Sequence, residues 1–144
     1  MNIYGIAIGV WVTGALWLIY HYFVRIVDNF GFENSHPLEQ WWLIAHACFS
    51  FAAVWMFGVL WPNHIKKGWK MKARRPTGGG LFGVILWLTL TGLALYYIGS
   101  DAWRSWTSIL HWTVGLAGIV VFLWHLVTRA THDDKEHYDS EATG

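Results

Sequence analysis

The chain has 144 residues, of which 55% are hydrophobic and 13% are charged, and its formal net charge is +1. Water-soluble domains carry about a quarter charged residues, so this composition excludes an ordinary soluble globular protein. A net charge this small also gives no reason to expect nucleic acid as a partner. The charged residues lie mostly outside four long apolar runs, at residues 3–24, 41–61, 81–98 and 105–128.

Each apolar run reaches or approaches the roughly 20 residues that a helix needs to cross the hydrocarbon core of a bilayer. Because the backbone finds no water there, the runs must be helices or strands of a closed barrel. Their apolarity is continuous and does not alternate with a period of two, which excludes the barrel. The sequence therefore predicts an all-α fold.

We expect an integral membrane four-helix bundle with helices at about residues 3–26, 39–61, 79–99 and 105–129, which together form one domain over residues 1–131. The first run has no basic segment before it and no small-residue cleavage site after it, so we interpret it as a retained helix rather than a signal peptide. Residues 132–144 are polar and are predicted to form a cytoplasmic tail.

The connection over residues 62–78 is basic and sets the predicted topology. It contains no acidic residue and holds Lys66, Lys67, Lys70, Lys72, Arg74 and Arg75. The positive-inside rule places this connection in the cytoplasm, and with four spans both termini are cytoplasmic as well. We therefore predict a multi-pass protein of the bacterial inner (cytoplasmic) membrane, in contact with membrane lipid.

Histidines within membrane spans are costly and usually have a function. The first along the chain is His21, in the last turns of the first predicted helix. With Tyr20, Tyr22 and Arg25 it can line a quinone pocket. Asp28, the next carboxylate along the chain, can form a protonatable site with it. The alternatives are that His21 is a metal ligand in place of another histidine, or an interfacial residue in an aromatic belt.

The second predicted helix carries His46 and leads to His64. The two are 18 residues apart, which is five full turns, so they share a face at about 27 Å separation if the helix stays regular. Pro62 lies between them and removes a backbone donor, so the helix is expected to be disturbed near Gly58.

The fourth predicted helix carries His111 and His125, which are 14 residues apart. Along a regular helix they are separated by about 21 Å and by only about 40° around the axis. One face therefore presents a histidine in each leaflet. Gly78 and Gly92 are also 14 residues apart, and such glycines serve either to admit a flat ring or to pack helices closely.

The predicted topology sorts these histidines into two level pairs. His46 and His111 lie near the periplasmic surface, and His64 and His125 lie near the cytoplasmic surface. A haem takes an axial imidazole on each side of its plane, so the four residues are predicted to ligate the iron of two haems b. The chain has one cysteine, Cys48, and no C-x-x-C-H motif, which excludes covalent attachment of the haems.

Three segments resemble bacterial four-helix cytochromes b, a group that includes the cytochrome b561 type and the b subunits of nickel-iron hydrogenases and formate dehydrogenases. They are HPLEQWWLIAHA at residues 36–47, TGLALYYIGSDAWRSW at 91–106 and LHWTVGLAGIVVFLWHLV at 110–127. The resemblance implies that His111 and His125 ligate two different haems and that His46 is the partner of His111.

One departure from that family concerns the fourth ligand. The family usually takes it from the cytoplasmic half of the first helix, where this chain has no histidine. His64 on the second helix is expected to replace it, which is closer to the ligand pattern of cytochrome b in quinol–cytochrome c reductases. A single-haem protein that uses His46 and His111 is the alternative.

The predicted function is electron transfer across the membrane between a quinone pool and a redox partner, as a subunit of an oxidoreductase complex. Because the chain has little room for a soluble domain, we expect a catalytic or c-type cytochrome subunit as partner, on the periplasmic side. A second hypothesis is that the protein itself oxidises or reduces quinone, with His21 and Asp28 as the protonatable site. A third, from another class, is a non-redox membrane subunit or small transporter whose histidines relay protons or metal ions.

Overall fold

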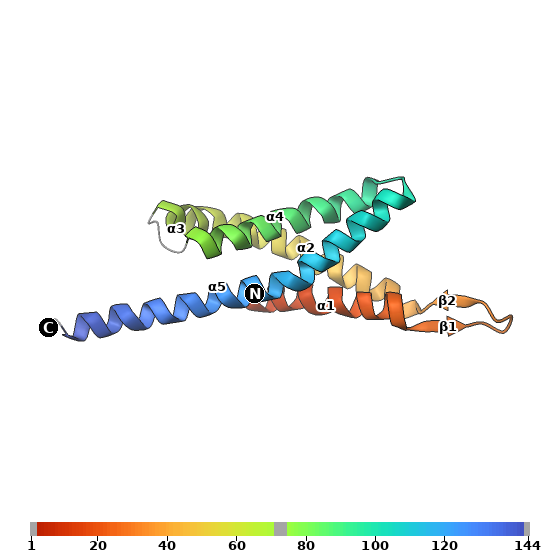
Figure 1. Ribbon diagram of the computed structural model, residues 1–144, viewed down its shortest axis with the longest axis horizontal. Helices are drawn as coiled ribbons and strands as arrows, with labels where there is room; N and C mark the ends of the chain where they lie inside the picture. Colours follow the sequence, from red (N-terminus) through yellow and green to blue (C-terminus); the bar gives the residue numbers. More distant parts are fainter. Residues whose placement is uncertain (1–2, 71–74, 143–144) are drawn as a thin grey trace. The chain divides into compact units, whose positions relative to one another are not determined.

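A computed structural model describes the backbone of residues 3–70 and 75–142 and the side chains of these residues as far as Val127. The described chain is mostly helical (Figure 1). Its helices are α1 (Ile3–Phe23), α2 (Pro37–Leu60), the π-helix η1 (Trp61–Ile65), α3 (Lys66–Lys70), α4 (Arg75–Tyr97) and α5 (Asp101–Ala142). Two short strands, β1 (Arg25–Val27) and β2 (Glu33–Ser35), lie between α1 and α2.

The prediction of four helices long and apolar enough to cross a membrane is confirmed. Their bounds differ from the predicted ones at several ends. The first helix stops at Phe23 and is followed by a strand, and the last continues as helix to Ala142, through most of the polar tail predicted at residues 132–144. The fold is therefore helical with one added β-hairpin.

The β-hairpin forms because its turn supplies its own hydrogen bonds. Arg25 pairs with Ser35 and Val27 with Glu33 in antiparallel register. In the turn between them the Asp28 carboxylate accepts the backbone N–H groups of Phe30 and Phe32, both at 2.9 Å. Gly31 adopts φ +84°, a left-handed conformation that glycine takes without steric cost. The hairpin extends beyond the ends of α1 and α2 (Figure 1).

Helix α2 begins at a well-defined cap. His36 Nδ1 accepts the backbone N–H of Leu38 at 3.1 Å, and Pro37 occupies the first turn, where its missing N–H costs nothing. Glu39, also in the first turn, is favoured there by the positive end of the helix dipole. The cap therefore fixes where α2 starts relative to the hairpin.

The end of α2 is irregular, as Pro62 predicts. The backbone from Trp61 to Ile65 forms the π-helix η1, in which the N–H of Lys66 reaches back to the carbonyl of Trp61. Such a turn contains an extra residue and changes the rotation of everything after it. The regular helix on which a shared face for His46 and His64 depends thus ends before His64.

The chain divides into two compact units, Met1–Lys66 and Lys67–Gly144. In the first unit α1 packs along α2, and in the second α4 packs along α5. Among the described side chains Ile6 and Thr13 are buried, whereas large apolar side chains such as Phe23, Phe51 and Tyr97 are exposed. Exposed apolar surface of this extent is typical of a surface that lipid or a partner covers.

The turn of the β-hairpin gives a prediction about pH. Hydrogen bonds from the backbone of Phe32 and then Phe30, together with the side chain of Asn34, hold the pKa of Asp28 below its ordinary value of 3.8. Because the folded pKa is lowered, the turn gains stability above the ordinary pKa and loses it as the pH falls through the folded one. The amide NMR shifts of Phe30 and Phe32 are expected to titrate with a midpoint below 3.8, and Asp28→Asn should abolish the titration. A midpoint at or above 3.8 would contradict this account.

Candidate functional site

His111 on α5 lies against a Thr–Gly step of α4. Its Nδ1 is 2.8 Å from Thr91 Oγ1, and a Cβ added at Gly92 would lie 3.3 Å from its Cε1. The missing side chain at Gly92 lets the imidazole approach the backbone of α4, and the Thr91 hydroxyl fixes the orientation of the ring.

The hydrogen bonds of Thr91 determine which nitrogen of His111 is protonated. The Thr91 hydroxyl has one proton and donates it to the carbonyl of Trp87, at 2.8 Å. Its oxygen therefore accepts the hydrogen bond from Nδ1–H of His111. On this ground we assign the tautomer protonated at Nδ1, which places the lone pair of the imidazole on Nε2.

His46 on α2 lies against α1 in the same manner. Its Nδ1 is 3.0 Å from the carbonyl oxygen of Val10 and 3.4 Å from Thr13 Oγ1. A carbonyl only accepts hydrogen bonds, so Nδ1 of His46 carries the proton. A Cβ at Gly14 would lie 3.0 Å from Cε1 of the ring, which is closer than at Gly92. His46 therefore shares the tautomer of His111 and its close approach to a glycine.

His125 repeats the arrangement about four turns further along α5. Its Nδ1 is 3.3 Å from Thr77 Oγ1, and a Cβ at Gly78 would lie 3.9 Å from its Cε1. Because α4 and α5 are antiparallel, the spacing of 14 residues between His111 and His125 is matched by the same spacing between Gly92 and Gly78. A single antiparallel register of α4 and α5 thus places each of the two histidines in contact with a Thr–Gly pair of α4.

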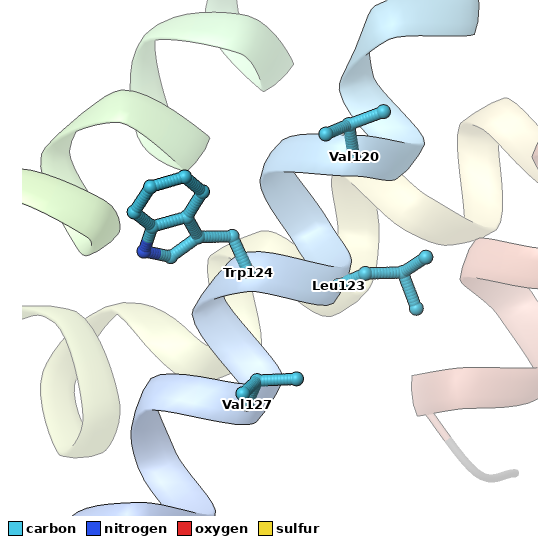
Figure 2. A pocket seen from close by; sticks show the side chains of 4 residues that line it. All are labelled: Val120, Leu123, Trp124 and Val127. Carbon is cyan, nitrogen blue, oxygen red and sulfur yellow. The ribbon is translucent and has the colours of Figure 1, made fainter.

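A groove between α4 and α5 adjoins the His125 contact. It has a volume of about 250 Å³ and is lined by Pro76, Thr77, Gly80, Val120, Val121 and Trp124. A second hollow of about 450 Å³ runs along α5 and is lined by Val120, Leu123, Trp124 and Val127 (Figure 2). With Thr77 as the exception, these linings are apolar, so the grooves suit an apolar ligand or lipid chain rather than an ion.

His64, the fourth predicted ligand, lies in η1 and is exposed. Its backbone is not part of the regular helix that carries His46. Its role as a ligand therefore stays a prediction from the sequence.

His21 is paired with a residue that the sequence analysis did not single out. Its Nδ1 lies 2.7 Å from Oε1 of Glu39, and the two side chains are 37% and 14% exposed. The ring stacks on Trp17 with centroids 4.7 Å apart, and Tyr22 meets it edge-on at 4.8 Å. His21 and Glu39 thus form a hydrogen-bonded acid–base pair within an aromatic surround.

The other residues predicted near His21 have different surroundings. Arg25 is the exposed first residue of β1, opposite Ser35. The Asp28 carboxylate accepts hydrogen bonds within the turn of the hairpin, where its second oxygen also accepts one from the side-chain amide of Asn34 at 3.2 Å. The structure therefore brings Glu39, and not Asp28, to the imidazole.

Glu39 could have been found from the symmetry of the hairpin. Arg25 and Ser35 face each other across the hairpin. Counting the same number of residues back from Arg25 and forward from Ser35 leads first to His21 and Glu39 and then to Gly14 and His46, which are the pairs that the structure brings into contact. Predicting these pairs from the sequence requires the position of the turn, and Asp28 and Gly31 indicate that position because both are typical turn residues.

The three helical histidines His46, His111 and His125 fit the requirements of axial haem ligands. A metal-binding imidazole donates one ring N–H to a neighbouring acceptor and binds the metal through the other nitrogen. His46 and His111 have that acceptor at Nδ1, and His125 has the Thr77 hydroxyl in the same place. Among the described side chains no three His, Cys, Asp or Glu residues gather as they would around a metal ion held by protein alone.

Comparisons with protein families, with curated proteins and with solved structures found no match to this chain. The resemblance to four-helix cytochromes b therefore stays a prediction. The argument for function rests on the geometry around the histidines.

The close approach of His46 to Gly14 predicts a specific sensitivity to a methyl group. In Gly14→Ala the new Cβ meets a ring that the Val10 carbonyl holds in place, so we expect destabilisation by about 1–3 kcal/mol from overpacking. Gly83→Ala is the matched control, because nothing lies within 4 Å of a Cβ there. The measurement is the midpoint of thermal unfolding in detergent. Equal midpoints for the two variants would contradict the described contact.

Proposed function

We propose that the protein is a dihaem b-type cytochrome subunit that transfers electrons across a membrane between a quinone pool and a redox partner. The observation that carries the proposal is the repeated setting of His46, His111 and His125. Each lies within a long apolar helix, against a Thr–Gly step of the neighbouring helix, with an acceptor at Nδ1. A metal-ligating histidine almost always donates its other ring N–H to such an acceptor, so the repeated setting favours axial ligation over packing alone.

The residues of the chain have distinct tasks in this function. When bound, a haem supplies an iron that accepts and releases one electron at a time. Thr91 and Val10 hold the imidazoles of His111 and His46 in the Nδ1–H tautomer, so that Nε2 is the nitrogen presented to an iron. Gly14 and Gly92 supply the space for those rings.

The proposal keeps the axial pairs predicted from the sequence, His46 with His111 and His125 with His64. The first pair is the better supported, because both members have the Nδ1 acceptor and the facing glycine. His64 lies in η1, so its assignment rests on its predicted depth alone. A carrier with one haem at His46 and His111 is the reduced form of the same proposal.

The proposed setting is a bacterial inner membrane, with both termini and the basic connection on the cytoplasmic side. Support comes from four helices of sufficient length and apolarity and from their exposed apolar side chains. The proposed partner is a catalytic or c-type cytochrome subunit on the periplasmic side, since the predicted topology would put a haem at His46 and His111 nearer that surface. Quinone is the proposed membrane-soluble reactant.

A pair of threonines on α4 tests the proposal. Thr91→Val removes the acceptor of His111 without changing the size of the side chain, and loss of such a partner weakens metal binding about 10- to 100-fold. Thr89→Val removes a hydroxyl on the same helix whose described hydrogen bond is to the carbonyl of Ile85, so it is the matched control.

The measurement is the rate at which each purified protein loses haem to excess apomyoglobin. We expect one haem of Thr91→Val to be lost about 10- to 100-fold faster than in the wild type, and Thr89→Val to behave like the wild type. Equal rates in the two variants would contradict the role of Thr91, and a wild-type protein without haem would contradict the proposed function.

A further inference from the structure

We propose that His21 and Glu39 form the site at which a quinol binds and gives up its protons. The inference rests on the proposed function, because the electrons require a haem as acceptor. It adds the substrate's position and the group that takes the proton. The starting observation is the 2.7 Å hydrogen bond between His21 Nδ1 and Glu39 Oε1.

The polarity of this hydrogen bond makes His21 a proton acceptor. A carboxylate accepts, so Nδ1 of the neutral imidazole donates and the lone pair is on Nε2. Proton uptake at Nε2 produces an imidazolium that faces the Glu39 carboxylate and is stabilised by it, as in a histidine–carboxylate pair of a hydrolase. His21 is 37% exposed, so a ligand from the membrane boundary can reach it.

Two buried polar atoms on the first two turns of α2 have no hydrogen-bond partner in the described part of the chain. They are Glu39 Oε2 and, one turn later on α2, Trp42 Nε1. Buried polar groups are normally satisfied by protein, water or a ligand. One atom is an acceptor and the other a donor, and a hydroxyl group, which donates and accepts, matches both kinds.

The surroundings favour an aromatic hydroxyl compound that dissolves in lipid. Trp17 stacks on the imidazole at 17° between ring planes, and Tyr22 stands across it. Tyr22, Phe23 and Trp41 are exposed close to the pair along α1 and α2. A quinol has both the flat ring and the hydroxyl groups that this environment selects.

The pair lies along the same helix seam as the proposed haem ligand His46. His21 is seven residues beyond Gly14 on α1, and Glu39 is seven residues before His46 on α2. Seven residues are about two turns, or roughly 10 Å, and return to nearly the same face. An electron that leaves a quinol at His21 therefore has a short path to a haem on His46.

The reaction balances with the haem as oxidant. Both O–H bonds of one quinol break, and the products are one quinone, two protons and two electrons. The protons pass in succession to Nε2 of His21 and from there to water at the exposed edge of the ring. A ferric haem held by His46 would supply the oxidant, because it would take up the two electrons in two one-electron steps.

The test uses the haem-containing protein in detergent, with duroquinol as the donor and dithionite as a donor that needs no site. His21→Phe keeps a ring against Trp17 but removes both nitrogens, and Glu39→Gln removes the charge. Glu33→Gln, in the exposed strand β2, is the control for loss of a carboxylate. We expect haem reduction by duroquinol to slow about 100-fold or more in the first two variants and not in the control, with complete reduction by dithionite in all three.

A second measurement needs no turnover, and its first readout uses the wild-type chain alone. With the haem already reduced by dithionite, equilibrium dialysis should show one duroquinol bound per wild-type chain, and weaker binding to His21→Phe. No saturable binding, or equal rates in all variants, overturns this inference while the cytochrome proposal stands. A wild-type protein without haem overturns the proposed function, and the inference with it.

Discussion

The hydrogen bond from a histidine Nδ1 to the neighbouring helix is the interaction on which the account of this protein depends. His46 donates to the carbonyl of Val10, and His111 donates to Thr91, whose own proton goes to the Trp87 carbonyl. In an apolar environment a polar group without a partner is costly, so these acceptors allow the imidazoles to lie within long apolar helices. The same bonds decide the tautomer, and with it the nitrogen that a metal would meet.

The antiparallel register of each helix pair repeats this kind of contact at several places. In the first unit the turn at Asp28 and Gly31 sets strand pairing, and the same register places His21 opposite Glu39 and Gly14 opposite His46. In the second unit the register of α4 and α5 sets two Thr–Gly steps against two histidines. At Gly14 and Gly92 glycine allows a ring to approach closely, because an added Cβ would lie 3.0 and 3.3 Å from it, whereas at Gly78 the distance of 3.9 Å to the His125 ring is an ordinary contact.

The sequence predicted the four long helices well, because continuous apolarity is a strong signal for a helix that can cross a membrane. It also singled out His46, His111 and His125 from their positions within those helices. It missed the threonine acceptors and Glu39, since these depend on which residues face each other across a helix pair and not on spacing along one helix. The β-hairpin was missed because three-residue strands have too little periodicity to detect, and η1 was foreseen only as a disturbance at Pro62.

The haem content of the purified protein tests the central claim most directly. A reduced-minus-oxidised absorption spectrum identifies b-type haem, and a pyridine haemochrome assay gives the number of haems per chain. The account predicts two haems b per chain, or one if His64 is not a ligand and only the pair His46 and His111 binds haem. A protein that contains no haem, although made in cells able to synthesise it, would contradict the account and favour a proton or metal-ion relay through the same histidines.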